Sequence, residues 1–174
     1  KLATLEGAEQ CLATASGMSA IFATIMTLLK PGEHMVASRG MFGTTIVLLN
    51  TVIQKFGIEV TFVDLPNLND WKNSVQTNTK LFLLETPSNP LGEVVDLRAL
   101  SVISKKNNVI LAVDNCIMTP ALQKPLALGA DLVIHSATKY IDGQGRCLAG
   151  AIAGNNRLID KISRFARVTG PTLS

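Results

Sequence analysis

Short apolar stretches alternate along the chain with longer segments in which apolar residues recur at helical spacing. The short stretches are rich in β-branched residues and have the length of single strands. This alternation predicts an α/β fold, with a mainly parallel sheet covered on both faces by helices. The predicted strands are 11–15, 35–38, 58–63, 80–85, 109–113, 131–135 and 149–153. The predicted helices are 17–29, 42–55, 69–76, 96–107, 120–128 and 156–167.

The amino-terminal stretch KLATLEGAEQ carries no start signal for any element, and the chain begins with Lys1 rather than Met. No repeat, linker or low-complexity tract interrupts the alternating pattern. We therefore expect residues 1–174 to form a single domain that is part of a longer chain.

Composition indicates one sizeable core, because 47% of the 174 residues are apolar. The net charge of +3 is spread along the chain and only 5% of residues are aromatic, so a nucleic-acid partner is not expected. The longest apolar run, AIFATIMTLL, is too short to cross a bilayer, and no segment resembles a signal peptide. A membrane partner is therefore not expected either.

Three cysteines, Cys11, Cys116 and Cys147, lie far apart among small or apolar neighbours. Their spacing matches no metal site, and no metal is expected. We interpret them as buried thiols in a reducing compartment, which favours a cytoplasmic protein.

Polar residues that follow the predicted strands are the candidates for chemistry, because ligands of parallel sheets bind at the carboxyl ends of the strands. In TASGMSAI, Ser16 and Gly17 stand between a strand and an apolar helix. Backbone N–H groups at such a helix start favour an anion, with phosphate the natural candidate. An ordinary N-cap explains the same residues.

Two further strand ends carry charged groups. VILAVDN ends in Asp114, which needs a partner at the rim of a buried strand and can either cap the next turn or hold a cationic ring nitrogen. In LVIHSATKYIDG, Lys139 follows Ser136 and Thr138, whose hydroxyls can donate to a phosphate. A lysine in a partly dry pocket becomes a usable nucleophile and base, whereas a surface lysine at a strand end is the simpler interpretation.

A fourth strand end, LFLLETPSNPLG, places Glu85 and Asn89 beside two prolines that stiffen the loop. A rigid turn needs no function by itself. The four ends together supply an anion site, two hydroxyls, an acid and a lysine at one rim of the sheet. That combination matches the needs of pyridoxal phosphate, which requires a phosphate cradle, a partner for its ring nitrogen and an imine-forming lysine.

The motifs ATASGMSAI, ETPSNPLG, VDN and HSATKY occur in the order found in the pyridoxal-phosphate enzymes of cysteine and methionine metabolism, which the sequence resembles over essentially its whole length. The stretch HSATKYIDGQGRCLAGAI is most similar to the O-succinylhomoserine sulfhydrylase branch of that family. The resemblance implies a three-layer, type I fold. It also implies that residues 1–174 are an incomplete cofactor-binding large domain, without the family's amino-terminal arm and carboxyl-terminal small domain.

The resemblance further implies roles for single residues. Lys139 is expected to form the Schiff base with the cofactor and to act as the general base, and Asp114 to pair with the ring nitrogen. The expected phosphate contacts are the backbone N–H groups of Gly17 and Met18 and the hydroxyls of Ser136 and Thr138.

Other residues near the expected site receive lesser roles. Asn89 is expected near the cofactor's phenolic oxygen, with Glu85 as a supporting neighbour. Phe42 occupies the place where many relatives have a tyrosine stacked on the ring, so the stacking face is kept and the hydroxyl is lost. Tyr140 and His135 are expected to be structural.

The activity implied by the resemblance is replacement at the γ-carbon of an O-acylated homoserine, with sulfide displacing succinate to give homocysteine. Cystathionine γ-synthase or γ-lyase chemistry on the same lysine is an alternative, and a non-catalytic cofactor-binding domain is another. Relatives act as homo-oligomers, dimers or tetramers, and we expect the same of the full-length protein.

Overall fold

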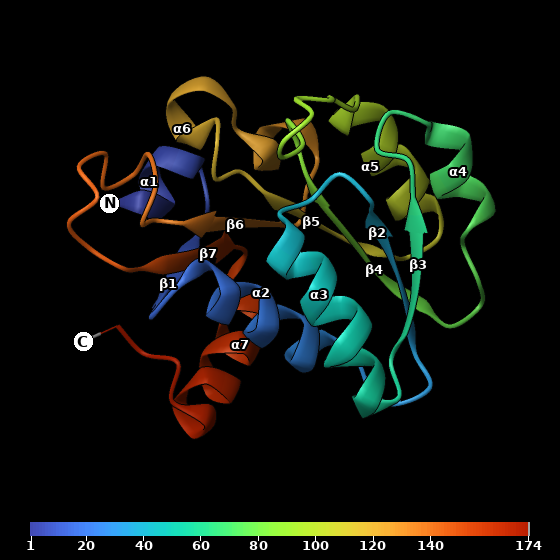
Figure 1. Ribbon diagram of the computed structural model, residues 1–174, viewed down its shortest axis with the longest axis horizontal. Coiled ribbons are helices and arrows are strands. Elements are labelled where there is room, and N and C mark those ends of the chain that lie inside the picture. The colour runs from blue at the N-terminus through green and yellow to red at the C-terminus, as the bar shows by residue number, and fades with distance from the viewer. Residues whose placement is uncertain (174) are drawn as a thin grey trace.

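A seven-stranded sheet crosses the molecule, which a computed structural model describes for residues 1–173 (Figure 1). The strand order is β1-β7-β6-β5-β4-β2-β3. Only β7 runs antiparallel to its neighbours among the described strands, so the predicted mainly parallel sheet is confirmed. The strands are β1 (Gln10–Thr14), β2 (His34–Ser38), β3 (Glu59–Val63), β4 (Thr79–Glu85), β5 (Ile110–Asp114), β6 (Leu132–Ser136) and β7 (Gly150–Gly154).

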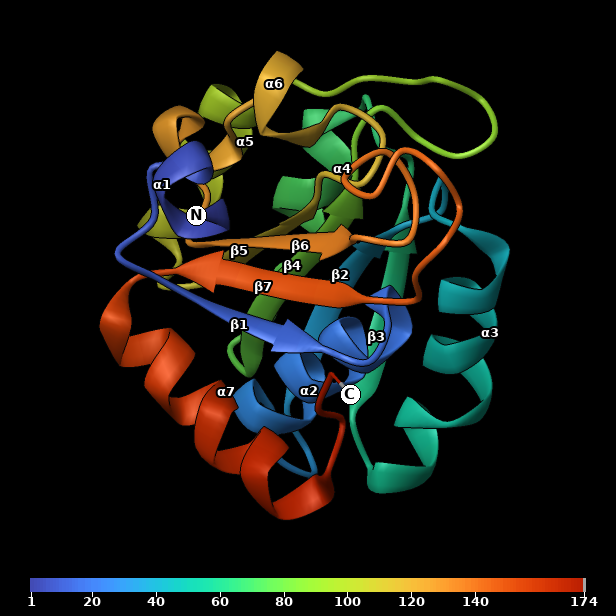
Figure 2. The same ribbon diagram turned by 90° about the vertical axis from the view of Figure 1, so that its left-hand side faces the viewer.

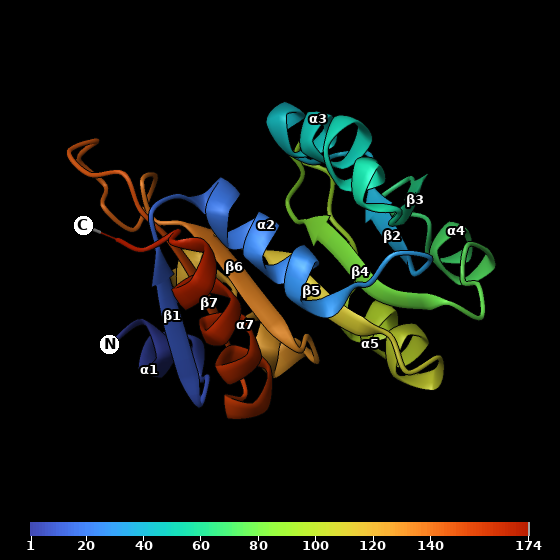
Figure 3. The ribbon, with the colours of Figure 1, turned by 90° about the horizontal axis from the view of Figure 1, so that it is seen from below.

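Helices cover both faces of this sheet, as Figure 2 shows along its edge. On one face α2 lies between α7 and α3, which is clear when the molecule is seen from below (Figure 3). The other face carries α1, α4, α5 and α6 (Figure 2). The helices are α1 (Leu2–Glu6), α2 (Gly17–Leu28), α3 (Gly43–Thr51), α4 (Leu68–Asn73), α5 (Leu97–Lys106), α6 (Thr119–Leu122) and α7 (Asn156–Thr169), with 3-10 turns η1 (Ile53–Phe56) and η2 (Pro125–Leu128).

Each face of the sheet has its own hydrophobic core. On the α2 side, Ile25 and Leu49 pack with Ile162 from α7. On the α5 side, Trp71 and Phe82 pack with their rings 5.2 Å apart. The inner strands β2, β4, β5, β6 and β7 are mostly buried from both sides, which explains why their sequences are nearly continuous apolar runs rather than alternating ones.

The predicted strands are confirmed, each within one residue at either end. Helix 42–55 is instead α3 followed by η1, because the chain tightens into a 3-10 turn before Gly57, whose φ of 72° is left-handed. Helix 120–128 is instead α6 and η2. Pro125 excludes the helical conformation for Lys124, whose φ and ψ are −122° and 85°.

Helix α1 was not predicted. It has five residues, no side-chain cap at Lys1 and a left-handed Gly7 at its end, so neither its length nor its start gives a periodic signal. No helix in residues 1–173 is long and apolar enough to cross a membrane.

Candidate active site

The carboxyl ends of β1, β4, β5 and β6 meet at one edge of the sheet, because all four strands run in the same direction. A cavity of about 840 Å³ opens at this edge, a size suited to a cofactor or small substrate. The predicted cofactor residues all line it, and they are Gly17, Met18, Phe42, Asn89, Asp114, Ser136, Thr138 and Lys139. The structure therefore brings together residues that are up to 122 positions apart in the sequence (17 to 139).

The start of α2 forms an anion cradle on one wall of the cavity. Ser16 caps the helix, with its Oγ accepting from the N–H of Ser19 at 3.1 Å. Gly17 and Met18 are the first two residues of the helix, so their N–H groups have no acceptor within it. These two N–H groups also have no acceptor elsewhere among the described residues. Two free N–H donors and the positive end of the dipole of a twelve-residue helix thus lie together on this wall of the cavity.

Gly17 also sets how closely this cradle approaches β6. A Cβ at Gly17 would lie 2.7 Å from the Cβ of Ser136 and 2.9 Å from its Cα. Glycine therefore lets the helix start and the strand end touch. The hydroxyl of Ser136 makes no hydrogen bond within residues 1–173 and is available to the cavity.

The hydroxyl of Thr138 is engaged inside the protein. Its Oγ1 donates to the carbonyl of Ala149 at 3.2 Å and accepts from the Ala149 N–H at 3.1 Å. These two bonds close the loop that joins β6 to β7. The predicted phosphate contact of Thr138 therefore requires its hydroxyl to turn away from Ala149, whereas that of Ser136 requires no such change.

Lys139 lies in the turn that follows β6, with its N–H donating to the carbonyl of Ser136 at 3.3 Å. Its side chain is exposed and makes no ion pair with any described residue. Residues 1–173 therefore do not form the expected partly dry pocket around this amine. The amine remains free to reach into the space lined by Asp114 and Ser136.

Asp114 ends β5 and lies half-buried in the cavity wall. Its Oδ1 accepts from the N–H of Cys116 at 3.0 Å. Burial and, to a lesser extent, the negative charge of Glu85 raise the pKa of this carboxyl to about 7, against the opposing effect of the Cys116 hydrogen bond. A cationic group placed in the cavity beside Asp114 would favour the ionised carboxylate.

Glu85 supports the site from behind the cavity wall. It is 4% exposed, and its Oε2 accepts from the backbone N–H of Phe42 at 2.8 Å. Burial raises the pKa of Glu85, and the hydrogen bond from Phe42 partly offsets that rise. The bond fixes the start of α3, where the ring of Phe42 is 46% exposed and lines the cavity.

The loop after β4 is held in place by its own hydrogen bonds. Ser88 exchanges backbone bonds with Glu93 and Gly92, and the N–H of Asn89 donates to the carbonyl of Gly40 at 3.3 Å. These bonds orient the segment that carries Asn89 into the cavity wall.

Tyr140 and Cys116 are among the cavity residues that were not predicted to lie there. Tyr140 was expected to be structural, but residues 137–142 form a turn, and Lys139 and Tyr140 both line the cavity. Cys116 also lines it, with its Sγ donating to the carbonyl of Ser136. Its position after Asp114 was the only signal in the sequence.

The prediction of three buried thiols is wrong. Cys147 is exposed because it lies in the loop between β6 and β7, and Cys11 and Cys116 are half-buried. Burial and the nearby Asp114 charge raise the pKa of Cys116 to about 11, so its thiol is protonated at neutral pH. No group of three potential metal ligands occurs in the part of the chain that the structure describes.

The observed groups fit a cofactor that carries both a phosphate and an aldehyde. Two free backbone donors and the Ser136 hydroxyl match the phosphate, Lys139 supplies an amine, and Asp114 matches a protonated ring nitrogen. This set on a mainly parallel, helix-covered sheet defines the class of pyridoxal-phosphate-dependent enzymes.

Comparison with known proteins agrees with that class and narrows it. The family described as Cys/Met metabolism PLP-dependent enzyme matches residues 1–174, and the chain belongs to this family. The resemblance seen in the sequence motifs is thereby confirmed.

Several relatives are more than a third identical to this chain over the matched residues. An O-succinylhomoserine sulfhydrylase from Pseudomonas aeruginosa is 53% identical over all of this chain and 43% of its own length. An L-methionine gamma-lyase from Fusobacterium nucleatum subsp. polymorphum is 48% identical over 93% of this chain and 41% of its own. The crystal structure of metB from Corynebacterium glutamicum matches 99% of this chain and 45% of its own with a TM-score of 0.96 and 38% identity. The chain thus spans less than half the length of each of these proteins.

Proposed function

We propose that the protein replaces the acyl group of an O-acylated homoserine with sulfide, giving homocysteine, in sulfur amino-acid metabolism. The observation that carries this proposal is the convergence of Lys139, Asp114 and the anion cradle at Gly17 on one cavity. The 53% identity to an O-succinylhomoserine sulfhydrylase supports the choice of succinate as the leaving group and sulfide as the nucleophile.

Each residue has a task that follows from its position. The N–H groups of Gly17 and Met18 and the hydroxyl of Ser136 would hold the phosphate, and Lys139 would supply the amine for the aldehyde. Asp114 keeps the ring nitrogen protonated, and Phe42 offers its ring face for stacking. When bound, pyridoxal phosphate supplies an electron sink for a carbanion at the substrate's α-carbon.

Lys139 is the group placed to move protons. Its amine takes the α-proton of the amino acid and returns a proton after the reaction at the γ-carbon. The net change breaks the bond between the γ-carbon and the ester oxygen, releases succinate, and forms a bond between the γ-carbon and sulfur. Phe42 has no hydroxyl, so it takes no part in this proton transfer.

A γ-lyase or cystathionine γ-synthase activity is the second candidate, because the L-methionine gamma-lyase is 48% identical to this chain over 93% of its residues, including those that line the cavity. The two candidates differ in what attacks or leaves at the γ-carbon rather than in the use of Lys139. A binding domain without catalysis is disfavoured, since binding alone does not need an imine-forming amine beside Asp114.

The test is product formation by the protein in its full natural length. O-succinylhomoserine is supplied with sulfide, with cysteine, or alone, methionine is supplied alone in a separate assay, and the products are identified by mass spectrometry. Homocysteine formed fastest with sulfide supports the proposal. Cystathionine as the dominant product identifies the synthase, and a keto acid formed from methionine or from the ester alone identifies the lyase.

We also infer that the working protein contains further segments around this cofactor domain and assembles as a cytoplasmic homo-oligomer. The support is that the relatives extend beyond the matched region and that Lys139 is left exposed by residues 1–173. Light scattering of the full-length protein tests the assembly.

A further inference from the structure

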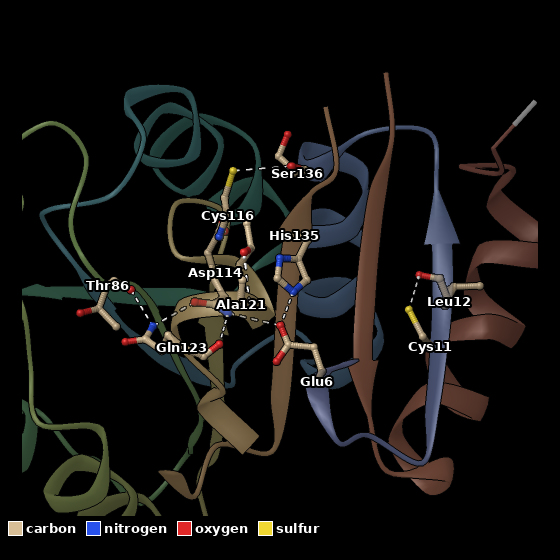
Figure 4. A network of polar contacts seen from close by, with 12 residues as sticks. Glu6, Cys11, Leu12, Thr86, Asp114, Cys116, Ala121, Gln123, His135 and Ser136 are labelled. Atoms are coloured by element: carbon tan, nitrogen blue, oxygen red, sulfur yellow. Dashed lines mark hydrogen bonds and ion pairs between the residues drawn. The ribbon is translucent and has the colours of Figure 1, made fainter. Parts of the chain in front are cut away.

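A buried polar network joins α1 to two strand ends of the site, with Glu6 at its centre (Figure 4). One oxygen of Glu6, Oε1, accepts from Nε2 of His135 at 2.6 Å and from Nδ2 of Asn115 at 3.2 Å. The exposed fractions of Glu6, Asn115 and His135 are 1%, 0% and 0%. None of the three lines the cavity, so the network is not in direct contact with a bound ligand.

The network continues to a third strand end through Gln123. Nδ2 of Asn115 also donates to the carbonyl of Gln123 at 2.9 Å, and Oδ1 of Asn115 accepts from Nε2 of Gln123 at 3.0 Å. The same amide nitrogen of Gln123 donates to the carbonyl of Thr86 at 2.9 Å, as Figure 4 shows. Every polar atom of the Asn115 side chain is therefore satisfied.

The positions of these residues in the chain connect the network to the predicted cofactor residues. Asn115 directly follows Asp114, and His135 directly precedes Ser136. Thr86 begins the loop that leads to Asn89. One carboxylate oxygen on a five-residue helix thus ties together the ends of β5 and β6, and through Gln123 the end of β4.

The network is not arranged for stability alone. Oε2 of Glu6 and Nδ1 of His135 are buried without a hydrogen-bond partner among the described residues. Burying unsatisfied polar atoms costs free energy, and an apolar contact of similar volume would avoid that cost. A polar network at this place fits a role in fixing geometry, because hydrogen bonds specify direction as well as contact.

We propose that Glu6 is a positioning residue for the cofactor site, acting through Asn115 on Asp114 and through His135 on Ser136. This inference rests on the proposed use of the cavity for pyridoxal phosphate. If α1 only anchored the amino terminus, loss of Glu6 would lower stability without selectively loosening these strand ends.

The experiment compares Glu6→Ala and Glu6→Gln with the wild type in the full-length protein. The alanine variant removes the acceptor, whereas glutamine keeps an oxygen at the place of Oε1. Glu9→Ala is the matched control, because the Glu9 carboxylate is exposed, lies three residues further on, and accepts only from the N–H of Asn156. All samples are compared at temperatures where far-ultraviolet circular dichroism shows them fully folded.

The first measurement is amide hydrogen exchange, which needs no cofactor. The N–H of Asn115 donates to Ile134 at the end of β5, and the N–H of Arg39 donates to Val63 at the end of β2, both at 2.9 Å. Only the former belongs to a strand end tied by Glu6. We expect Glu6→Ala to raise the exchange rate of Asn115 relative to Arg39 by at least about tenfold, and Glu6→Gln and Glu9→Ala by less than about threefold.

The second measurement is a titration with pyridoxal phosphate, followed by visible absorbance and by the induced circular dichroism of the bound cofactor. We expect Glu6→Ala to weaken binding by about tenfold and to change the induced signal, with most of the affinity recovered in Glu6→Gln. Equal affinity, signal and exchange ratio in wild type and Glu6→Ala would overturn the inference.

The two proposals fail in different ways. A wild-type protein that binds no pyridoxal phosphate overturns the proposed function, while the exchange ratio still decides whether Glu6 positions the strand ends. A wild-type protein that binds the cofactor, with unchanged Glu6 variants, overturns the positioning role alone.

Discussion

Glu85 and Asp114 are register partners at the carboxyl ends of neighbouring parallel strands, so two acidic residues end adjacent strands at the same edge of the sheet. The negative charge of Glu85, added to burial, raises the pKa of Asp114 to about 7. The two groups nevertheless have separate surroundings. Glu85 accepts from the N–H of Phe42 behind the wall, whereas Asp114 faces the cavity, where a cationic ring nitrogen would compensate its charge.

This raised pKa predicts how the stability of the cofactor-free protein changes with pH. The folded protein holds the proton of Asp114 up to about pH 7, whereas the unfolded chain loses it near the ordinary value of 3.8. Stability from this group is therefore present below about pH 4 and is lost as pH rises to about 7. We expect a loss on the order of 2–4 kcal/mol in the free energy of unfolding across that window.

Urea denaturation of wild type and Asp114→Asn at several pH values between 4 and 8 measures this effect. Asparagine has nearly the same shape and cannot ionise, so the difference between the two proteins isolates the carboxyl. The wild type should lose stability relative to Asp114→Asn as pH rises. Parallel curves for the two proteins would show that the pKa of Asp114 is not raised.

Gly17→Ala is predicted to destabilise the protein by about 1–3 kcal/mol, because the new methyl group would overlap the Cβ and backbone Cα of Ser136. The clash separates the start of α2 from the end of β6, so cofactor affinity should fall as well. Gly43→Ala is the matched control, since Gly43 also begins a helix and a Cβ there meets nothing within 4 Å. Urea denaturation that shows equal effects for the two substitutions would contradict the close approach.

Lys139→Ala is predicted to abolish the visible absorbance of the protein incubated with pyridoxal phosphate. Because Lys139 is exposed and makes no ion pair within residues 1–173, the substitution should change the protein's free energy of unfolding by less than about 0.5 kcal/mol. Lys80→Ala removes another exposed lysine, from β4, and should leave both quantities unchanged. An unchanged visible band in Lys139→Ala would exclude this lysine as the attachment point.

The strands and the shared rim of the site could be predicted from the sequence for a physical reason. Strands buried on both faces must be continuous apolar runs, and residues that follow parallel strands must gather at one edge. Asp114, Ser136 and Lys139 could therefore be expected near one another from their places after apolar runs alone. Their motifs also matched a family, which added the identity of the cofactor.

The supporting contacts could not be predicted in the same way. Glu6 lies 129 positions from His135 on a five-residue helix without a start signal, so no local pattern pairs them. The engagement of Thr138 with Ala149 depends on how the loop closes eleven residues later. Tyr140 reaches the cavity because residues 137–142 form a turn, whereas the sequence indicated only a structural role for it.

The hydroxyls of Ser136 and Thr138, which both precede Lys139, are predicted to serve different purposes. Ser136→Ala removes a hydroxyl that has no partner within residues 1–173, so stability should change by less than about 0.5 kcal/mol while affinity for pyridoxal phosphate falls several-fold. Thr138→Val breaks both side-chain bonds to Ala149 and should cost about 1–3 kcal/mol, because the buried N–H of Ala149 loses its partner while its carbonyl keeps only the bond from the Thr138 N–H. Thr138→Ser keeps the hydroxyl and should restore most of that stability.

Urea denaturation and cofactor titration of the three variants separate these effects. If Ser136→Ala left the affinity unchanged and Thr138→Val reduced it at equal stability, the phosphate contact would belong to Thr138. That outcome would require the Thr138 hydroxyl to leave Ala149 when the cofactor binds, and the loop between β6 and β7 would then exchange its closing hydrogen bonds for a contact with the ligand. With Ser136 as the donor, the loop stays closed by the same two bonds in both states, and binding needs no rearrangement at this wall.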